Sequence, residues 1–91
     1  MSINDLFKAL ADENRRKILD LLRNRDLTAG EISYHFEMSK PAISQHLAIL
    51  KSAELVYSDK KGQFVYYSLN TTVFQDIMKW AIQFNHSKGE K

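Results

Sequence analysis

The sequence contains no cysteine, one proline and three glycines. Without cysteine the chain cannot form disulfide bonds, use a thiolate nucleophile or hold a metal through thiolates. It has no apolar run near the roughly 18 residues that a membrane-spanning helix needs, so we expect no membrane insertion. The first five residues also lack the basic segment and apolar run of a secretory signal, and we therefore expect a cytoplasmic protein.

The length and composition fit one small globular domain, with 91 residues of which 44% are hydrophobic and 26% charged. We expect a single domain over residues 1–88 and a disordered tail over 89–91, with loss of order setting in near His86. A domain of this size buries only somewhat over about 60% of its unfolded surface. A dimer interface would therefore be a natural source of further stability.

The formal net charge of +2 is too small to indicate a polyanionic partner by itself. Its distribution is more informative, because acidic and basic residues nearly balance over residues 1–37. Residues 38–63 then carry Lys40, Lys51, Lys60 and Lys61 against only Glu54 and Asp59. A positive excess in the middle of the chain is the place to look for a contact with phosphate.

Apolar residues recur with helical spacing in four stretches before residue 53. Three of them follow residues that cap helix N-termini: Asp12, then Thr28 with Glu31 in capping-box spacing, and Ser39 with Pro41 in the next first turn. The expected buried stripes are Ile3, Leu6, Phe7 and Leu10; Ile18, Leu19, Leu21 and Leu22; Ile32 and Phe36; and Ile43, Leu47 and Leu50.

From Leu55 the pattern changes to strands. Residues 55–58 and 63–69 are rich in β-branched and aromatic side chains, and residues 59–62 between them predict a hairpin with a basic tip. A last helix begins at Asn70 or Thr71. Its apolar face is wider than one-sided packing needs and comprises Val73, Phe74, Ile77, Met78, Trp80, Ala81 and Phe84.

This order of elements, mostly α with one β-hairpin, is that of a winged helix-turn-helix domain. In such a domain the second helix of the turn enters the major groove of DNA, and the hairpin reaches the adjacent backbone. The helix from residue 40 suits that role because its face opposite the buried stripe carries no acidic residue. Glutamine can bond adenine through two hydrogen bonds, and serine can donate or accept at base edges.

We therefore predict that Ser44 and Gln45, with Lys40 or His46, read bases, and that lysines and Arg16 neutralise phosphates. The complete set of predicted DNA contacts is Ser39, Lys40, Ala42, Ser44, Gln45, His46, Lys51, Lys60, Lys61, Gln63 and Arg16.

Two alternatives stay open at this point. His46 is equally compatible with a half-buried histidine whose hydrogen bonds are satisfied within the chain. Arg15 and Arg16 are ambiguous, because at least one of them is expected to pair with acidic residues of its own helix, Asp12, Glu13 or Asp20.

Three stretches, residues 11–22, 39–50 and 61–69, resemble the characteristic segments of the ArsR/SmtB repressors, and the similarity spans about residues 3–85. Within that family the chain is most similar to the SdpR-like autorepressor group, through residues 26–30 and 61–64 followed by Tyr-Tyr-Ser-Leu-Asn. The resemblance implies a homodimer on a palindromic operator, joined through its first and last helices. The interface residues it implies are Ile3, Leu6, Phe7, Leu10, Val73, Phe74, Ile77, Trp80, Ala81 and Phe84.

The same resemblance raises the question of a metal, because the family includes metal sensors. Thr28 and Gly30 stand where one type of site has Cys-x-Cys, and neither can hold a thiophilic metal. The other type, on the last helix, would need Asp and His near its start, where residues 70–73 offer neither. Asp76, His86 and Glu90 do not complete a set of ligands. We therefore predict no metal and no cofactor.

The predicted function is a sequence-specific DNA-binding repressor that acts as a homodimer on an inverted repeat, and the resemblance implies an autorepressor. The alternative is a winged-helix interaction module whose last helix docks an unidentified regulatory protein. A small hydrolase is excluded, because no cluster of acid, base and nucleophile can be assembled. Ser44 and His46 cannot serve, since residues two apart on a helix point about 200° from each other.

Overall fold

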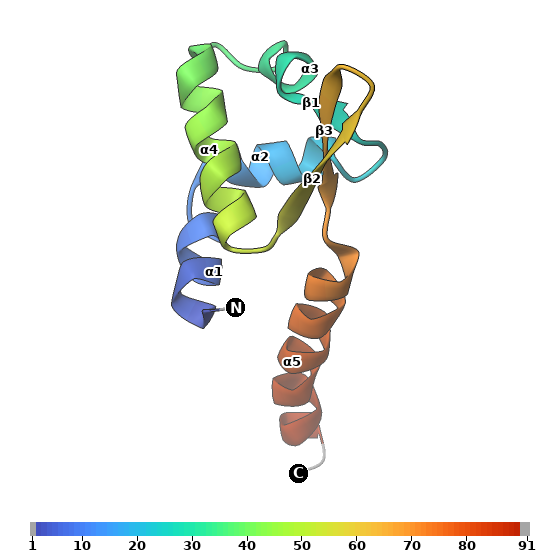
Figure 1. Ribbon diagram of the computed structural model, residues 1–91. Coiled ribbons are helices and arrows are strands. Elements are labelled where there is room, and N and C mark those ends of the chain that lie inside the picture. Colours follow the sequence, from blue (N-terminus) through green and yellow to red (C-terminus); the bar gives the residue numbers. More distant parts are fainter. Residues whose placement is uncertain (1, 90–91) are drawn as a thin grey trace.

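The computed structural model describes the backbone of residues 2–89 and the side chains of residues 2–85. Helices and strands follow the predicted order, so the winged helix-turn-helix fold is confirmed (Figure 1). The elements are α1 (Ile3–Leu10), α2 (Glu13–Leu21), β1 (Leu27–Thr28), α3 (Ala29–Ser33), α4 (Lys40–Ser52), β2 (Val56–Lys61), β3 (Phe64–Leu69) and α5 (Thr71–Gly89).

The predicted helix caps are present and explain where the helices begin. Asp12 Oδ2 accepts the backbone N–H of Arg15 at 3.0 Å, at the start of α2. Thr28 and Glu31 form a complete capping box at α3, with hydrogen bonds of 3.1 and 2.9 Å. Ser39 caps α4, and a proline stands in the first turn of that helix, where its missing N–H leaves no hydrogen bond unmade.

The core lies between α1 to α4 and the sheet. Its fully buried large side chains include the predicted stripe of α4 and the isoleucines of α2 and α3. Leu55, just before β2, and Val56, at its start, complete this set. The set is Ile18, Ile32, Ile43, Leu47, Leu50, Leu55 and Val56. The core thus fixes which face of α4 is left for solvent.

The sheet has three antiparallel strands in the order β1-β3-β2, one more than the sequence predicts. The additional strand β1 has only two residues, Leu27 and Thr28, which pair with Tyr67 and Tyr66 of β3. A strand this short carries no alternating pattern that a sequence could display.

The predicted position of the hairpin tip was wrong. Pairing continues to Lys61 opposite Phe64, so the basic residues lie in β2 and the turn is Gly62-Gln63. Gly62 has φ +66°, a conformation that glycine adopts without steric cost, and it stands at the first position of a two-residue turn.

Helix α5 projects from the body of the molecule, along the long axis of a chain whose extents are 54 × 26 × 22 Å (Figure 1). Of the α5 side chains that are described, which end at residue 85, only Val73 is buried, while Phe74 and Ile77 pack partly against the core. The backbone is helical to Gly89, and the disorder expected from His86 onward stays a prediction. The last two residues of the predicted tail lie outside the described residues. Among residues 2–89, no helix is long and apolar enough to cross a membrane.

Candidate nucleic-acid interface

Helix α4 presents an exposed ridge built from the residues predicted to read bases. Ser44 and Gln45 are exposed, as are Ser39 and Lys40 at the start of the helix, whereas Ala42 and His46 are only half-exposed. The Oγ of Ser39 already accepts the N–H of Ala42 at 3.3 Å, because it caps the helix. The side chains free to project from the ridge are therefore mainly those of Lys40, Ser44 and Gln45.

A groove runs along each side of this ridge. On one side, a groove of about 140 Å³ separates α4 from the start of α3 and is lined by Ala29, Gly30, Lys40, Ile43 and Ser44. On the other side, a wider groove of about 440 Å³ separates α4 from α1 and is lined by Asp5, Lys8, Gln45, Ala48, Ile49, Ser52 and Ala53. The ridge between two grooves is the shape expected of an element that enters a groove of DNA.

The hairpin, or wing, is tied to the end of α4. Lys51 Nζ donates to Ser58 Oγ of β2 at 2.9 Å, so this lysine, predicted as a DNA contact, joins the helix to the wing. Because residues two apart on a strand share a face, Lys60 lies on the same face as Ser58, which is turned toward α4.

Lys61 lies on the other face of the wing. Its Nζ is 5.8 Å from the centre of the Tyr66 ring, and both side chains point away from the face that holds Ser58. Gln63 is exposed in the turn. The sequence predicts the same phosphate-binding role for Lys60 and Lys61, but the two side chains lie on opposite faces of the wing.

The arginines of α2 cap the end of α1. Arg16 Nη1 donates to the carbonyl of Leu10 at 2.8 Å, and Arg15 donates through Nε to Ala9 at 2.8 Å and through Nη2 to Lys8 at 2.9 Å. Cations are stabilised at a helix C-terminus, where carbonyls lack helical partners. The sequence does not reveal this structural role, and the contact of Arg16 with phosphate stays a prediction.

His46 is oriented inward between α4 and α2. Its side chain is 19% exposed, its Nδ1 lies 3.4 Å from Arg15 Nη1, and Asp12 Oδ2 is 3.9 Å away. The geometry favours the half-buried alternative over a direct contact with a base.

The hydrogen bond from the Arg15 backbone and the charge of Arg15 stabilise the ionised form of the Asp12 carboxyl group. Its hydrogen bond from the Arg15 backbone lowers the pKa of Asp12 below the ordinary value of 3.8, against the opposing effect of burial. The positive charge of Arg15 lowers the same pKa further. Asp12 therefore stays ionised at neutral pH and caps α2 as a carboxylate.

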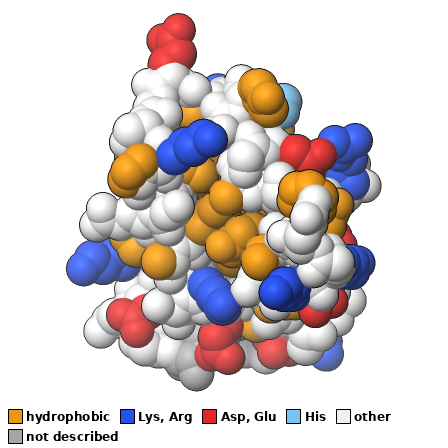
Figure 2. Space-filling model, turned by 45° about the horizontal axis from the view of Figure 1, so that its top comes forward, with side chains coloured by type: hydrophobic (Ala, Val, Ile, Leu, Met, Phe, Trp, Pro, Cys, Tyr) orange, Lys and Arg blue, Asp and Glu red, His pale blue; other side chains and the backbone are white. Residues whose placement is uncertain are grey.

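Charge on the face seen from the α3, α4 and wing end is mixed. Figure 2 shows Lys and Arg side chains spread around the margin of this face, with acidic side chains among them and hydrophobic ones near the centre. A dispersed pattern of this kind suits several separate phosphate contacts better than one focused anion site.

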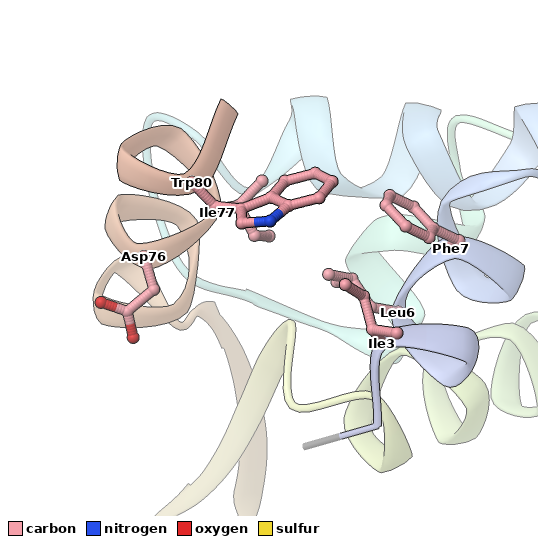
Figure 3. A pocket seen from close by; sticks show the side chains of 6 residues that line it. All are labelled: Ile3, Leu6, Phe7, Asp76, Ile77 and Trp80. Atoms are coloured by element: carbon pink, nitrogen blue, oxygen red, sulfur yellow. The ribbon is translucent and has the colours of Figure 1, made fainter. Parts of the chain in front are cut away.

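A second surface, the apolar cleft, lies between α1 and α5. Figure 3 shows Ile77 and Trp80 of α5 turned toward the side chains of α1, with Asp76 directed away. The cleft has a volume of about 190 Å³ and is lined by Ile3, Leu6, Phe7, Asp76, Ile77 and Trp80. The rings of Phe7 and Trp80 are 6.0 Å apart, and Phe84 packs edge-on against Trp80 at 5.0 Å.

The predicted dimer residues divide by exposure. Leu6 and Val73 are buried within the chain and belong to its core, and Leu10, Phe74 and Ile77 are half-exposed. The exposed members are Ile3, Phe7, Trp80, Ala81 and Phe84. Met78 and Ile82 are also exposed, at 58% and 48%. Met78 belongs to the predicted apolar face of the last helix, and Ile82 does not.

No group of three or more metal-ligating side chains comes together within the part of the chain whose side chains are described. Thr28 stands at one of the two positions where related metal sensors have cysteine. Its side-chain hydroxyl is part of the capping box of α3.

Comparison with known proteins decides the family. Residues 12–58 match the model of the arsR family of bacterial regulatory proteins. The chain belongs to the ArsR family. Over 82 residues it is 58% identical to the transcriptional repressor SdpR of Bacillus subtilis, covering 90% of this chain and 91% of that protein. It is also 45% identical over 67 residues to the transcriptional activator HlyU of Vibrio cholerae, covering 74% of this chain and 62% of that protein.

Solved structures agree with the ArsR fold. HlyU from Vibrio cholerae N16961 superposes with a TM-score of 0.73 at 36% identity, covering 90% of this chain and 89% of that one. An ArsR-like regulator from Rhodococcus sp. RHA1 gives 0.84 at 26% identity, covering 96% and 82%. Members of this family are DNA-binding transcriptional regulators and not enzymes, so the predicted class of function is confirmed.

Proposed function

We propose that this ArsR-family regulator is a repressor of its own gene, binding an inverted-repeat operator as a homodimer and needing no metal. The observation that carries the proposal is the exposed, acid-free ridge of α4, flanked by grooves and tied by Lys51 to the wing. Repression, rather than activation, is supported by the 58% identity to SdpR over nine tenths of the chain. The site of action would be the bacterial cytoplasm, which contains the chromosome.

In this proposal the ridge reads bases and the wing binds the backbone. Ser44 and Gln45 would contact base edges, with Lys40 at the start of the helix near phosphate or guanine. Lys60, on the face of the wing turned toward α4, would neutralise a phosphate beside the same groove.

Dimerisation would set the spacing of the two ridges. The exposed aromatic side chains of the apolar cleft and α5 offer a self-complementary surface at the end of the molecule away from the wing (Figure 1). A two-fold axis through this surface would place two copies of α4 roughly 34 Å apart, one turn of duplex DNA.

The test is fluorescence anisotropy of a labelled duplex from immediately upstream of the gene, against a scrambled duplex, at several salt concentrations and with and without chelator. We expect at least about a thousandfold preference for the upstream duplex, indifferent to chelator. A parallel selection from a pool of randomised duplexes identifies the operator if it lies elsewhere in the genome.

Equal, weak binding to both duplexes, with no sequence enriched by the selection, would contradict the proposal. The alternative of a partner-docking module on α5 would then explain the fold better. Binding that changes on chelation would show that the assignment of no metal is wrong.

A further inference from the structure

The side chain of Arg15 lies within hydrogen-bonding distance of both α1 and α4. From its position on α2, its Nε and Nη2 donate to the carbonyls of Ala9 and Lys8. These carbonyls belong to the last turn of α1, where helical partners run out, although the Lys8 carbonyl also accepts the N–H of Ala11 at 3.3 Å. Two of the guanidinium nitrogens are therefore committed to the end of α1.

The third guanidinium nitrogen of Arg15, Nη1, faces α4. Arg15 Nη1 lies 3.4 Å from His46 Nδ1, and the Asp12 carboxylate, which accepts the Arg15 backbone N–H, lies 3.9 Å from the same ring nitrogen. We call Asp12, Arg15 and His46 the Arg15 junction. It connects the end of α1, the start of α2 and the middle of α4 through directional polar contacts.

Directional contacts matter here because the rest of the α4 packing is apolar. Ile43, Leu47 and Leu50 are held by burial alone, and burial is non-directional. Hydrogen bonds are sensitive to distance and angle. His46 sits between Gln45 on the exposed ridge and Leu47 in the core, so holding its ring restricts the rotation of α4 about its own axis.

We propose that Arg15 is a positioning residue for DNA recognition, which fixes through His46 the rotation of α4 against α1 and α2. The inference rests on the proposed function, because it assumes that the ridge of α4 reads DNA. Arg15 itself need not touch the duplex. A small rotation of α4 would displace Ser44 and Gln45 from base edges while leaving the general affinity for phosphate unchanged.

The experiment measures the specificity ratio, which is the affinity for the upstream or selected duplex divided by that for its scramble. The variants are Arg15→Lys, His46→Leu and the double variant, each checked for folded fraction by circular dichroism. Arg15→Lys keeps the charge but loses the fork that reaches two helices at once. His46→Leu removes the acceptor on α4 and leaves both hydrogen bonds to α1 in place.

Two further variants distinguish a role of Arg15 in orienting α4 from a role in stabilising the end of α1 alone. Arg16→Lys removes the corresponding arginine contact to α1, at the carbonyl of Leu10, and Arg16 makes no hydrogen bond to α4 among the described residues. His46→Asn keeps an acceptor close to the place of Nδ1, since the Oδ1 of asparagine lies at a similar distance from the backbone.

We expect Arg15→Lys and His46→Leu each to lower the specificity ratio about tenfold, and the double variant to lower it no further than either alone. Arg16→Lys should leave the ratio unchanged, and His46→Asn should restore most of it. Affinity for the scrambled duplex should stay constant in the Arg15 and His46 variants.

An unchanged ratio in Arg15→Lys would overturn the proposal, as would additive losses in the double variant. Equal losses on both duplexes would instead identify Arg15 as a phosphate contact and also overturn it. A wild-type protein that does not discriminate between duplexes would overturn the proposed function and this inference together, whereas a discriminating wild type with an unaffected Arg15→Lys would overturn this inference alone.

Discussion

Individual side chains near the ridge of α4 differ in what they can reach, and the wing lysines show this most clearly. Lys60 shares its face with Ser58, which is bound to α4, whereas Lys61 lies over Tyr66 on the opposite face. We expect Lys60→Ala to weaken binding to every duplex and to lower the slope of log affinity against log salt by about one. Lys61→Ala is the matched control and should change the slope less. Equal effects in anisotropy titrations would show that the wing presents both faces to DNA.

Gln45 should affect sequence preference rather than general affinity. It is exposed on the ridge, and its side chain makes no hydrogen bond to the described residues. Gln45→Ala should relax the preference at one base pair by about 1 to 3 kcal/mol, measured with duplexes substituted at each position. Ser52→Ala, two turns along the same helix, provides the control and should leave the preference unchanged. Equal losses on operator and random DNA would contradict the base-reading role.

Asp12 makes stability depend on pH in the acid range. Because its folded pKa is lowered below 3.8, its contribution is fully present above that value and is lost as the pH falls through the folded pKa. Asp12→Ala should therefore reduce the free energy of unfolding by about 1 kcal/mol at pH 7, as expected for a lost N-cap. Urea denaturation at pH 7 and pH 3 should show this difference shrinking at the lower pH. A difference that is constant with pH would mean that ionisation of the cap is unimportant.

The sequence predicts the exposure of Ser44 and Gln45 well, because helical periodicity alone separates them from the buried stripe. It leaves two interpretations open for His46 and does not predict that Arg15 and Arg16 bind the end of α1. Arg15 and His46 are 31 positions apart, and a contact over that separation depends on the packing of α2 against α4. Local spacing contains no information about such a contact, so the arginines are naturally assigned to acidic neighbours or to phosphate.

At the scale of elements, the hairpin shows why boundaries are harder to predict than order. Strands disfavour Asp and Lys, so the sequence predicts the turn at Asp59, Lys60 and Lys61. In the structure β2 is an edge strand, and edge strands commonly carry charged side chains that discourage pairing with another chain. The turn instead forms at the residue that tolerates a positive φ, Gly62. The helices, by contrast, begin where capping residues place them.

Replacing each of two glycines with alanine should change the free energy of unfolding in opposite directions. Gly62 has φ +66°, so Gly62→Ala should lower the free energy of unfolding by about 1 kcal/mol although nothing lies within 4 Å of the added methyl group. Gly30 lies in α3 with ordinary backbone angles, and an added methyl group would meet only Thr28 Oγ1 at 3.8 Å. Gly30→Ala should therefore raise stability by about 0.5 kcal/mol. Thermal or urea unfolding measures both, and a stabilising Gly62→Ala would contradict the assigned turn.

At the scale of the whole molecule, the exposed apolar face of α5 predicts the assembly state. Phe84 is 60% exposed and packs on Trp80, which is itself 42% exposed. Phe84→Lys should weaken dimerisation by at least about tenfold in sedimentation equilibrium, because it places a charge in an apolar interface. Preference for the operator should fall with it.

Gln75→Lys adds the same charge on an exposed polar position of α5 and serves as the control. It should leave the dissociation constant of the dimer nearly unchanged. A Phe84→Lys variant that stays dimeric at the same concentration would contradict the proposed interface.

Because α5 projects from the body and buries little against its own chain, a lone copy leaves several large aromatic and aliphatic side chains in water. Pairing of two copies would then be governed by mass action, and the occupancy of an operator would rise with roughly the square of protein concentration at low abundance. In a gene that represses itself, such a dependence converts a gradual accumulation of product into a comparatively sharp shut-off. The strength of one helix-to-helix contact would thus set the abundance at which the cell stops making the protein.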